Sequence, residues 1–109
     1  MKLKVYKKQN GCLLWNCVVA DSPLKRAIGI MGKKKFEPLL FTFPYKHELP
    51  ISIHSFFCPV FYAIFLDKWK KVVQIRKFSS AEMFTSLPAA YLIEVNEKKG
   101  VKVGDALIW

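Results

Sequence analysis

Two histidines, three cysteines and eight acidic residues are the side chains of this sequence that could transfer a proton, attack a substrate or bind a metal ion. His54 and Cys58 are the one close pair that could combine a nucleophile with a base. On a strand they would point to the same face but lie about 13 Å apart, too far for proton transfer. His47, Glu48 and His54 carry metal-binding atoms, but their spacing is not diagnostic of a metal site. We therefore expect no catalytic residue, no metal site and no cofactor.

The segment Gly100–Asp105 contains two glycines but does not match a phosphate-binding loop. Such a loop needs a different glycine spacing and a helix after it, so this segment is typical of a turn before a last strand. An enzyme, for example a hydrolase with an unrecognised site, is one alternative function. Its site would need at least two of these titratable groups close together: Asp21, His47, His54, Asp67, Glu94 and Asp105.

Glu94 stands near the end of the apolar run Ala90–Val95. A carboxylate in such a run lies either on the exposed face of a strand or beside a base such as Arg26 inside a cleft. We expect it to be exposed. The candidate ligand-binding site of a binding module is a concave sheet face or a cleft near the predicted helix, with polar lining from Arg26, His54 and Glu94 and apolar lining from Trp15, Phe56 or Tyr91.

The chain is strongly basic, with 18 Lys and Arg residues against eight Asp and Glu residues and a net charge of +10 at pH 7. Only Arg26 and Arg76 are arginines. Lysine is a hydrated point charge, whereas arginine makes the bidentate contacts that read bases, so the charge favours non-specific attraction to polyanions. It also keeps an apolar chain in solution. The candidate polyanion-binding residues are Lys33, Lys34, Lys35, Lys68, Trp69, Lys70 and Lys71, with Lys98, Lys99 and Lys102 beside them.

The composition is that of a folded protein, since 52% of the 109 residues are hydrophobic and 15% are aromatic. This length suits a single domain, residues 1–109, with one core. Cys12 and Cys17 are five residues apart, which places them on opposite faces of a strand, so we expect reduced, buried thiols. Residues 1–11 lack the apolar core of a signal peptide. We expect a cytoplasmic protein.

The segment Leu49–Leu66 carries no formal charge and is just long enough to form a membrane-spanning helix. Its prolines and its many Ile, Val, Phe and Tyr residues favour strands instead. We expect two buried strands separated at Pro59 and no membrane span.

The opening residues predict a hairpin of Lys2–Lys8 and Leu13–Ala20, joined at Asn10 and Gly11. A three-residue loop closed by Gln9 and Leu13 is the preferred register, because a buried face fixes the register. It collects on one face the side chains of Leu3, Val5, Trp15, Cys17 and Val19.

A short helix is predicted near residues 22–31, where Ser22 can cap the first turn and apolar residues recur at helical spacing. Six short apolar runs follow between turn signals: Leu39–Phe43, Ile51–Cys58, Val60–Leu66, Val72–Phe78, Ala90–Val95 and Ala106–Trp109. Many short strands with one helix predict a mainly β fold, a small antiparallel β-sandwich or a jelly-roll-like barrel.

Several short motifs resemble, in order, those of domain-of-unknown-function family 192. They are Ala20–Met31, Leu39–Pro44, Ile53–Cys58, Ile64–Asp67, Pro88–Glu94 and Gly100–Asp105. The form of the third motif, Ile53–Cys58, is similar to that of archaeal members. The resemblance implies a small, largely antiparallel β-sandwich with a short helix and no established activity. The family usually has Pro-hydrophobic-Asp before its Phe-Leu-Asp motif, whereas Val60–Ala63 contains no acid, so a site that uses that Asp would be lost or remodelled here.

The leading hypothesis is a non-enzymatic binding or interaction module whose partner is an unknown small ligand or a protein. The second hypothesis is non-specific nucleic-acid binding through the lysine-rich loops. The chain is expected to be a monomer or a weak dimer.

Overall fold

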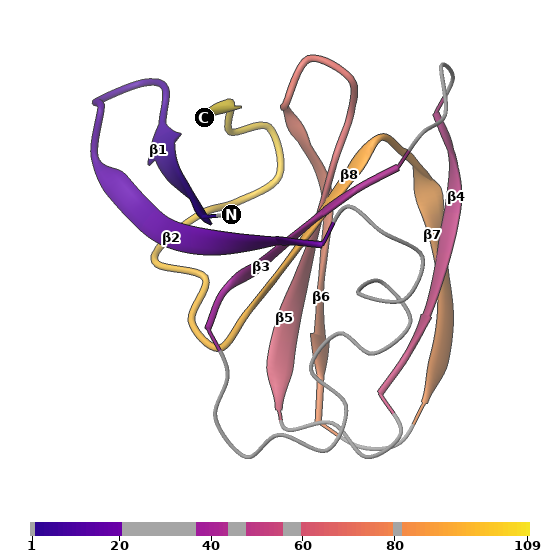
Figure 1. The fold of residues 1–109 in the computed structure, drawn as a ribbon. Coiled ribbons are helices and arrows are strands. Elements are labelled where there is room, and N and C mark those ends of the chain that lie inside the picture. Colours follow the sequence, from indigo (N-terminus) through magenta and orange to yellow (C-terminus); the bar gives the residue numbers. More distant parts are fainter. Residues whose placement is uncertain (1, 21–36, 44–47, 56–59, 80–81) are drawn as a thin grey trace.

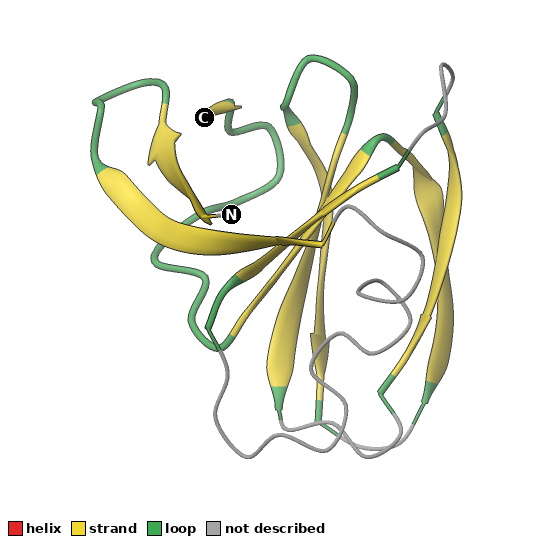
Figure 2. Cartoon of the chain, viewed as in Figure 1, coloured by secondary structure: helices red, strands yellow, loops and turns green. Residues whose placement is uncertain are grey.

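The computed structural model describes residues 2–20, 37–43, 48–55, 60–79 and 82–109. Every regular element in these residues is a strand (Figure 2). The strands are β1 Lys2–Lys7, β2 Leu13–Ala20, β3 Leu39–Thr42, β4 Leu49–His54, β5 Phe61–Leu66, β6 Val72–Phe78, β7 Met83–Ala89, β8 Tyr91–Val95 and β9 Leu107–Ile108. The helix predicted near residues 22–31 lies outside the described residues.

Seven strands form one curled sheet in the order β6-β5-β8-β3-β2-β1-β9, and β4 and β7 form a second, two-stranded sheet. The small sheet stands beside the end of the large sheet that holds β5, β6 and β8 (Figure 1). All strand pairs are antiparallel except β2 and β3, which run parallel where Val18–Ala20 meets Leu39–Phe41. The predicted mainly β, largely antiparallel architecture is confirmed. No helix among the described residues is long and apolar enough to cross a membrane.

The N-terminal hairpin has the predicted strands but not the predicted register. Val5 pairs with Trp15 and Leu3 with Cys17, and a bulge follows between Val5 and Tyr6. The loop closed by Gln9 and Leu13 is therefore wrong. The bulge adds Leu14 to the buried residues while Leu3, Val5, Trp15 and Cys17 keep a common buried face, so it hides more apolar surface. Cys12 is exposed, so its predicted burial is wrong, whereas Cys17 is buried. Burial raises the pKa of the Cys17 thiol to about 12.

The predicted strands after the hairpin are present with ends moved by at most one residue, apart from β4, which begins at Leu49 and ends at His54. Residues 56–59 are not described, so the break expected at Pro59 is not tested. The break expected across residues 79–88 is wrong, because β7 occupies Met83–Ala89. The Ser and Pro residues of β7 are weak strand signals in the sequence. This strand pairs with β4 alone, with Pro50 opposite Pro88. The Ser52 hydroxyl lies 3.0 Å from the Thr85 hydroxyl.

The two faces of the large sheet carry separate apolar clusters. One cluster includes Trp15, Leu40, Ile64, Ile93 and Leu107. We call the opposite face the inner face. Its cluster consists of Ala20, Leu39, Phe41, Phe61, Ala63, Phe65, Phe78 and Leu92, together with Ile51 of β4 and Ala89 of β7. The rings of Phe61 and Phe78 stack there with centroids 4.9 Å apart. The β4–β7 sheet thus packs against the inner face.

Candidate functional site

The residues of the predicted ligand cleft are not gathered in one place within the described chain. His54 is exposed at the end of β4, and burial along this strand puts it on the side opposite to Ile51. The indole Nε1–H of Trp15 donates to the carbonyl of Glu97 (3.0 Å), and Tyr91 packs edge-on against Trp109. Both rings belong to the cluster on the face opposite to the inner one. Seven of the predicted site residues lie outside the described residues: Asp21, Arg26, Lys33, Lys34, Lys35, His47 and Phe56.

Glu94 is buried, with 6% of its surface exposed, so its predicted exposure is wrong. Its strand β8 lies between β3 and β5, and both faces of the large sheet are covered there. The expectation that buried and exposed residues alternate along a strand assumes that one face of the sheet contacts water, so it fails for such a strand. Burial raises the pKa of the Glu94 carboxyl to about 8. No described residue forms a hydrogen bond or an ion pair with this carboxyl.

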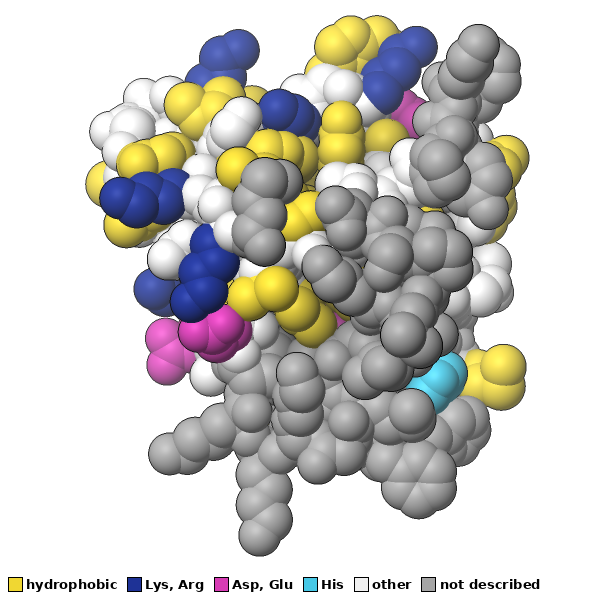
Figure 3. Space-filling model, in the orientation of Figure 1, with side chains coloured by type: hydrophobic (Ala, Val, Ile, Leu, Met, Phe, Trp, Pro, Cys, Tyr) yellow, Lys and Arg dark blue, Asp and Glu magenta, His cyan; other side chains and the backbone are white. Residues whose placement is uncertain are grey.

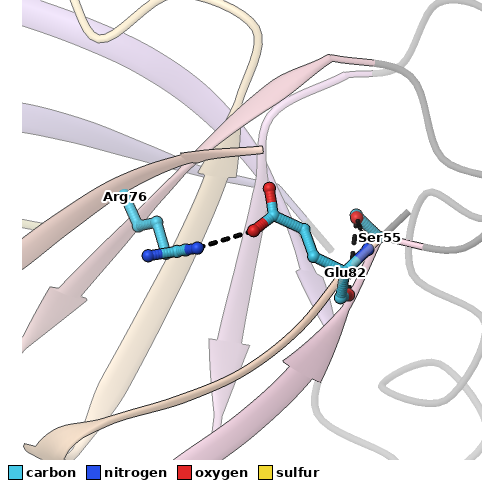
Figure 4. Close-up of polar contacts among 3 residues, drawn as sticks. All are labelled: Ser55, Arg76 and Glu82. Atoms are coloured by element: carbon cyan, nitrogen blue, oxygen red, sulfur yellow. Dashed lines mark hydrogen bonds and ion pairs between the residues drawn. The ribbon is translucent and has the colours of Figure 1, made fainter. Parts of the chain in front are cut away.

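Arg76 lies on the same face as Glu94, two strands away, with β5 between them. Glu94 is in register with Ala63 of β5, and Ala63 is in register with Arg76 of β6. The guanidinium lies over the ring of Phe84 at 4.4 Å. Its Nη2 donates to the Glu82 carboxylate over 2.6 Å, while its Nε is buried and has no hydrogen-bond partner (Figure 4). Sequence reasoning missed Arg76, although an arginine inside an apolar strand segment was a usable signal.

Glu82 and Ser55 join the small sheet to Arg76. The Glu82 N–H donates to the Ser55 hydroxyl (2.8 Å), and the Ser55 N–H donates to the Glu82 carbonyl (2.9 Å), just beyond the ends of β4 and β7 (Figure 4). Because the Glu82 side chain reaches Arg76, this pair fixes the β4–β7 sheet to β6. The cluster therefore has a structural role even without a ligand.

Three segments that are far apart in sequence meet at the end of the molecule that is uppermost in Figure 1. The N–H of Leu107 donates to the carbonyl of Lys70, and the N–H of Val72 donates to that of Asp105. The N–H of Lys8 donates to the carbonyl of Ala106. These bonds set the β5–β6 turn and the end of β1 on either side of residues 105–107. We call the resulting surface the lysine-rich end, which comprises Lys7, Lys8, Lys68, Trp69, Lys70, Lys71 and Lys102.

The β5–β6 turn presents Trp69 to solvent in a fixed conformation. Asp67 Oδ1 accepts the N–H groups of Trp69 and Lys71, both at 2.9 Å, and Lys70 has a positive φ of 64°. Trp69 is 73% exposed, with the Lys68 ammonium 4.5 Å from its ring centroid. Lysine and apolar side chains lie side by side over the upper part of the molecule (Figure 3). The predicted polyanion-binding residues of the β5–β6 turn thus lie beside residues from two other segments of the chain.

The carboxylates of this end are held within the fold. Asp105 accepts the N–H of Lys102 at 3.0 Å and lies 3.5 Å from the Lys7 ammonium. That backbone bond, and then Lys7, lower the pKa of Asp105. Glu48 accepts the N–H of Lys68 at 2.9 Å. Within the described parts of the chain, no group of three His, Cys, Asp or Glu residues could hold a metal ion.

The comparisons with known proteins agree with this fold. The family model DUF192, Uncharacterized ACR, matches residues 5–109. A UPF0127 protein of Pyrococcus horikoshii is 33% identical over 97 residues, which cover 84% of each chain. A UPF0127 protein of Pyrococcus furiosus is 31% identical over 96 residues, which cover 83% of each chain. A Novosphingobium aromaticivorans protein of unknown function superposes with a TM-score of 0.80 at 16% identity, covering 100% of this chain and 84% of its own. The chain belongs to the DUF192 family.

Proposed function

We propose that the protein is a non-enzymatic binding module that holds single-stranded nucleic acid at its lysine-rich end. The observation that carries the proposal is Trp69, a ring that is 73% exposed on a turn pinned by the Asp67 carboxylate. Burying such a ring in the core would be the ordinary way to stabilise the fold. An exposed ring held among lysines is instead suited to stack on a base.

Electrostatics supports a partner that carries phosphates. Lysines from three segments converge on this end, whereas its acidic side chains are engaged by backbone N–H groups or by Lys7. Phosphate contacts of this kind supply affinity that is independent of sequence and falls with salt. The basic residues described at this end are all lysines, which favours phosphate binding over the reading of base edges. Since a ring can stack only on an unpaired base, a single strand fits better than a duplex.

The test is fluorescence anisotropy of labelled 12-nucleotide RNA and DNA single strands and of a matched duplex, at NaCl concentrations from 50 to 300 mM. We expect the logarithm of the affinity to fall linearly with the logarithm of the salt concentration, with a slope of about −0.7 per phosphate contact. The variant K68E/K71E should bind at least about tenfold more weakly, because two attractive contacts become repulsive.

The matched control is K77E/K98E, which makes the same change in net charge near the opposite end of β5. Both control lysines lie by Tyr62, 5.8 and 5.9 Å from its ring centroid. They are separated from the β5–β6 turn by about 20 Å of strand, which is more than the screening length in 0.1 M salt. This control should change the affinity by less than about threefold. Equal losses in both variants, tighter binding of the duplex, or no salt-dependent binding would contradict the proposal.

A further inference from the structure

The strand β1 is paired along one of its sides and only partly paired along the other. Its pairing with β2 runs from Lys2 to Tyr6. On the opposite side it pairs with β9 at Tyr6 and Lys7, since β9 is only two residues long. No described strand continues this pairing along Lys2–Val5. The large sheet therefore has an open edge beside Lys2–Val5, at the end of β1 that is marked N in Figure 1.

The backbone hydrogen bonds at the other end of β1 show which residues point to this edge. The N–H of Lys7 donates to the carbonyl of Cys12 beside β2, whereas the N–H of Lys8 donates to the carbonyl of the residue just before β9. Successive residues of a strand point their backbone groups to opposite sides. The N–H and C=O groups of Lys2 and Lys4 therefore point to the open edge, where no described residue forms a hydrogen bond with them. Such an edge is a template for pairing with another extended chain.

Trp109 follows β9 but does not extend its pairing along β1, which ends at Ile108. The carbonyl of Trp109 accepts a bond from the Lys70 ammonium at 3.4 Å, and its ring packs edge-on against Tyr91. These contacts hold the residue at the lysine-rich end. The described chain thus leaves the place beside Lys4 to a different molecule.

The side chains along the open edge differ between its two faces. Lys2 and Lys4 are exposed, whereas Leu3 packs against the apolar cluster that contains Val5 and Trp15. Directly opposed residues of neighbouring strands share a face, so a complementary strand has acidic residues opposite the lysines and an apolar residue opposite Leu3. A second copy of this chain fits poorly, because pairing β1 with β1 brings lysines together between two chains that each have a net charge of +10.

We propose that β1 binds an extended acidic segment of another protein, which continues the sheet edge begun by β9. The segment runs antiparallel to β1, as β9 does, and has the pattern acidic–apolar–acidic. Its two acidic residues exchange backbone hydrogen bonds with Lys2 and Lys4 and place their carboxylates beside the ammonium groups. Lys2 contacts Glu37 at 2.9 Å, but both side chains are more than half exposed, so a peptide carboxylate can replace this weak surface pair.

The experiment measures the binding of a fluorescein-labelled peptide, GSVEVEVSG, to the full chain by fluorescence anisotropy in 0.1 M NaCl. Its matched control is the same peptide with methyl groups on the amide nitrogens of both glutamates. N-methylation keeps the charges and the side chains but removes the two donors that face β1. We expect saturable binding of the first peptide and binding at least about tenfold weaker for the methylated one, because two backbone hydrogen bonds are lost.

Hydrogen–deuterium exchange followed by NMR locates the bound peptide. In the free protein the Lys4 amide should exchange quickly, whereas the Leu3 amide points to β2 and should exchange slowly. Peptide at ten times its Kd should slow the exchange of Lys4 about tenfold, since only the free state exposes this N–H. The amide of Trp69 at the lysine-rich end should keep its rate.

Two variants at position 4 separate backbone pairing from charge. K4P removes the outward N–H without removing a bond to β2, and should weaken binding at least about tenfold. K4Q keeps this N–H and removes only the charge, so it should weaken binding by less than about threefold. Should K4P unfold, the methylated peptide still tests the backbone bonds. The proposal is overturned if methylation leaves the affinity unchanged, if the exchange of Lys4 is not slowed, or if the peptide protects only the lysine-rich end.

Discussion

The inner face and the lysine-rich end hold charged groups in opposite ways. On the inner face, Glu94 is buried and has no described partner, and Arg76 is only partly satisfied. At the lysine-rich end the acidic groups are satisfied by backbone N–H groups and lysines, and the large apolar ring of Trp69 is left in solvent. The inner face thus buries a carboxyl and one guanidinium nitrogen without a described partner, whereas the lysine-rich end pairs its carboxylates and exposes an apolar ring.

The difference shows where each region obtains its stability. The inner face rests on apolar packing strong enough to keep a carboxyl out of water. The lysine-rich end rests on the network of backbone hydrogen bonds that joins the β5–β6 turn to residues 104–107. Substitutions on the inner face should therefore mainly change the stability of the fold, whereas substitutions at the lysine-rich end should mainly change binding.

The largest effect on stability is expected from Phe61→Ala. The ring is fully buried and stacks on Phe78 at 4.9 Å. Its removal leaves a cavity and should lower the free energy of unfolding by about 3–5 kcal/mol, measured by urea denaturation. The control is Val60→Ala at a position that is 52% exposed, where the expected loss is below about 0.5 kcal/mol. A loss under about 1 kcal/mol for Phe61→Ala would break the contrast between the two regions.

The next effect is a pH dependence that belongs to Glu94. Its folded pKa of about 8 lies above the ordinary value of 4.5, so the folded state binds the proton more tightly. The stability from this proton is fully present below pH 4.5 and is lost as the pH rises to about 8. The slope is about 1.4 kcal/mol per pH unit, or about 3 kcal/mol between pH 5.5 and 7.5.

Urea denaturation of the wild type and of E94Q at pH 5.5, 6.5 and 7.5 measures this dependence. The wild type should lose stability relative to E94Q at each step. Asp105, with its pKa lowered from 3.8, titrates below this range and does not disturb the comparison. If the free energies of unfolding of the wild type and of E94Q changed in parallel with pH, Glu94 would have an ordinary pKa and the prediction would be contradicted.

The smallest effect on stability, under about 0.5 kcal/mol, is expected from Trp69→Ala, because the ring is 73% exposed. Its effect on single-strand affinity should be at least about fivefold, since stacking on one base is worth about 1–3 kcal/mol. Trp69→Phe is the matched control and should keep most of the affinity. An unchanged affinity in Trp69→Ala would remove the ring from the interface while leaving the lysines.

Apolar runs between turn signals were enough to predict most strands and the mainly β fold, and the order of several short motifs was enough to predict the family. Local patterns could not predict β7, because Ser86 and Pro88 are poor strand signals and their strand pairs only with β4. They also could not set the hairpin register, which depends on a bulge that buries Leu14. Both features depend on tertiary packing.

The site was harder to predict for the same reason. The lysines of the β5–β6 turn are adjacent in sequence, so half of the lysine-rich end was visible before folding. Glu94 and Arg76 are separated in sequence and meet only through the register of β8, β5 and β6. The burial of Glu94 follows from the covering of both faces of β8, which no local pattern reports.

The pairing of β1 with β9 has a consequence for synthesis in the cell. Tyr6 pairs with Ile108, so these strands are about 100 residues apart in sequence yet adjacent in the sheet. A ribosome makes β1 long before residues 107–108 exist, and an unpaired strand edge is a template for pairing with other chains. The lysines of β1, at positions 2, 4 and 7, place positive charge along this waiting edge. Charge repulsion between nascent chains then protects the edge until its partner strand is made.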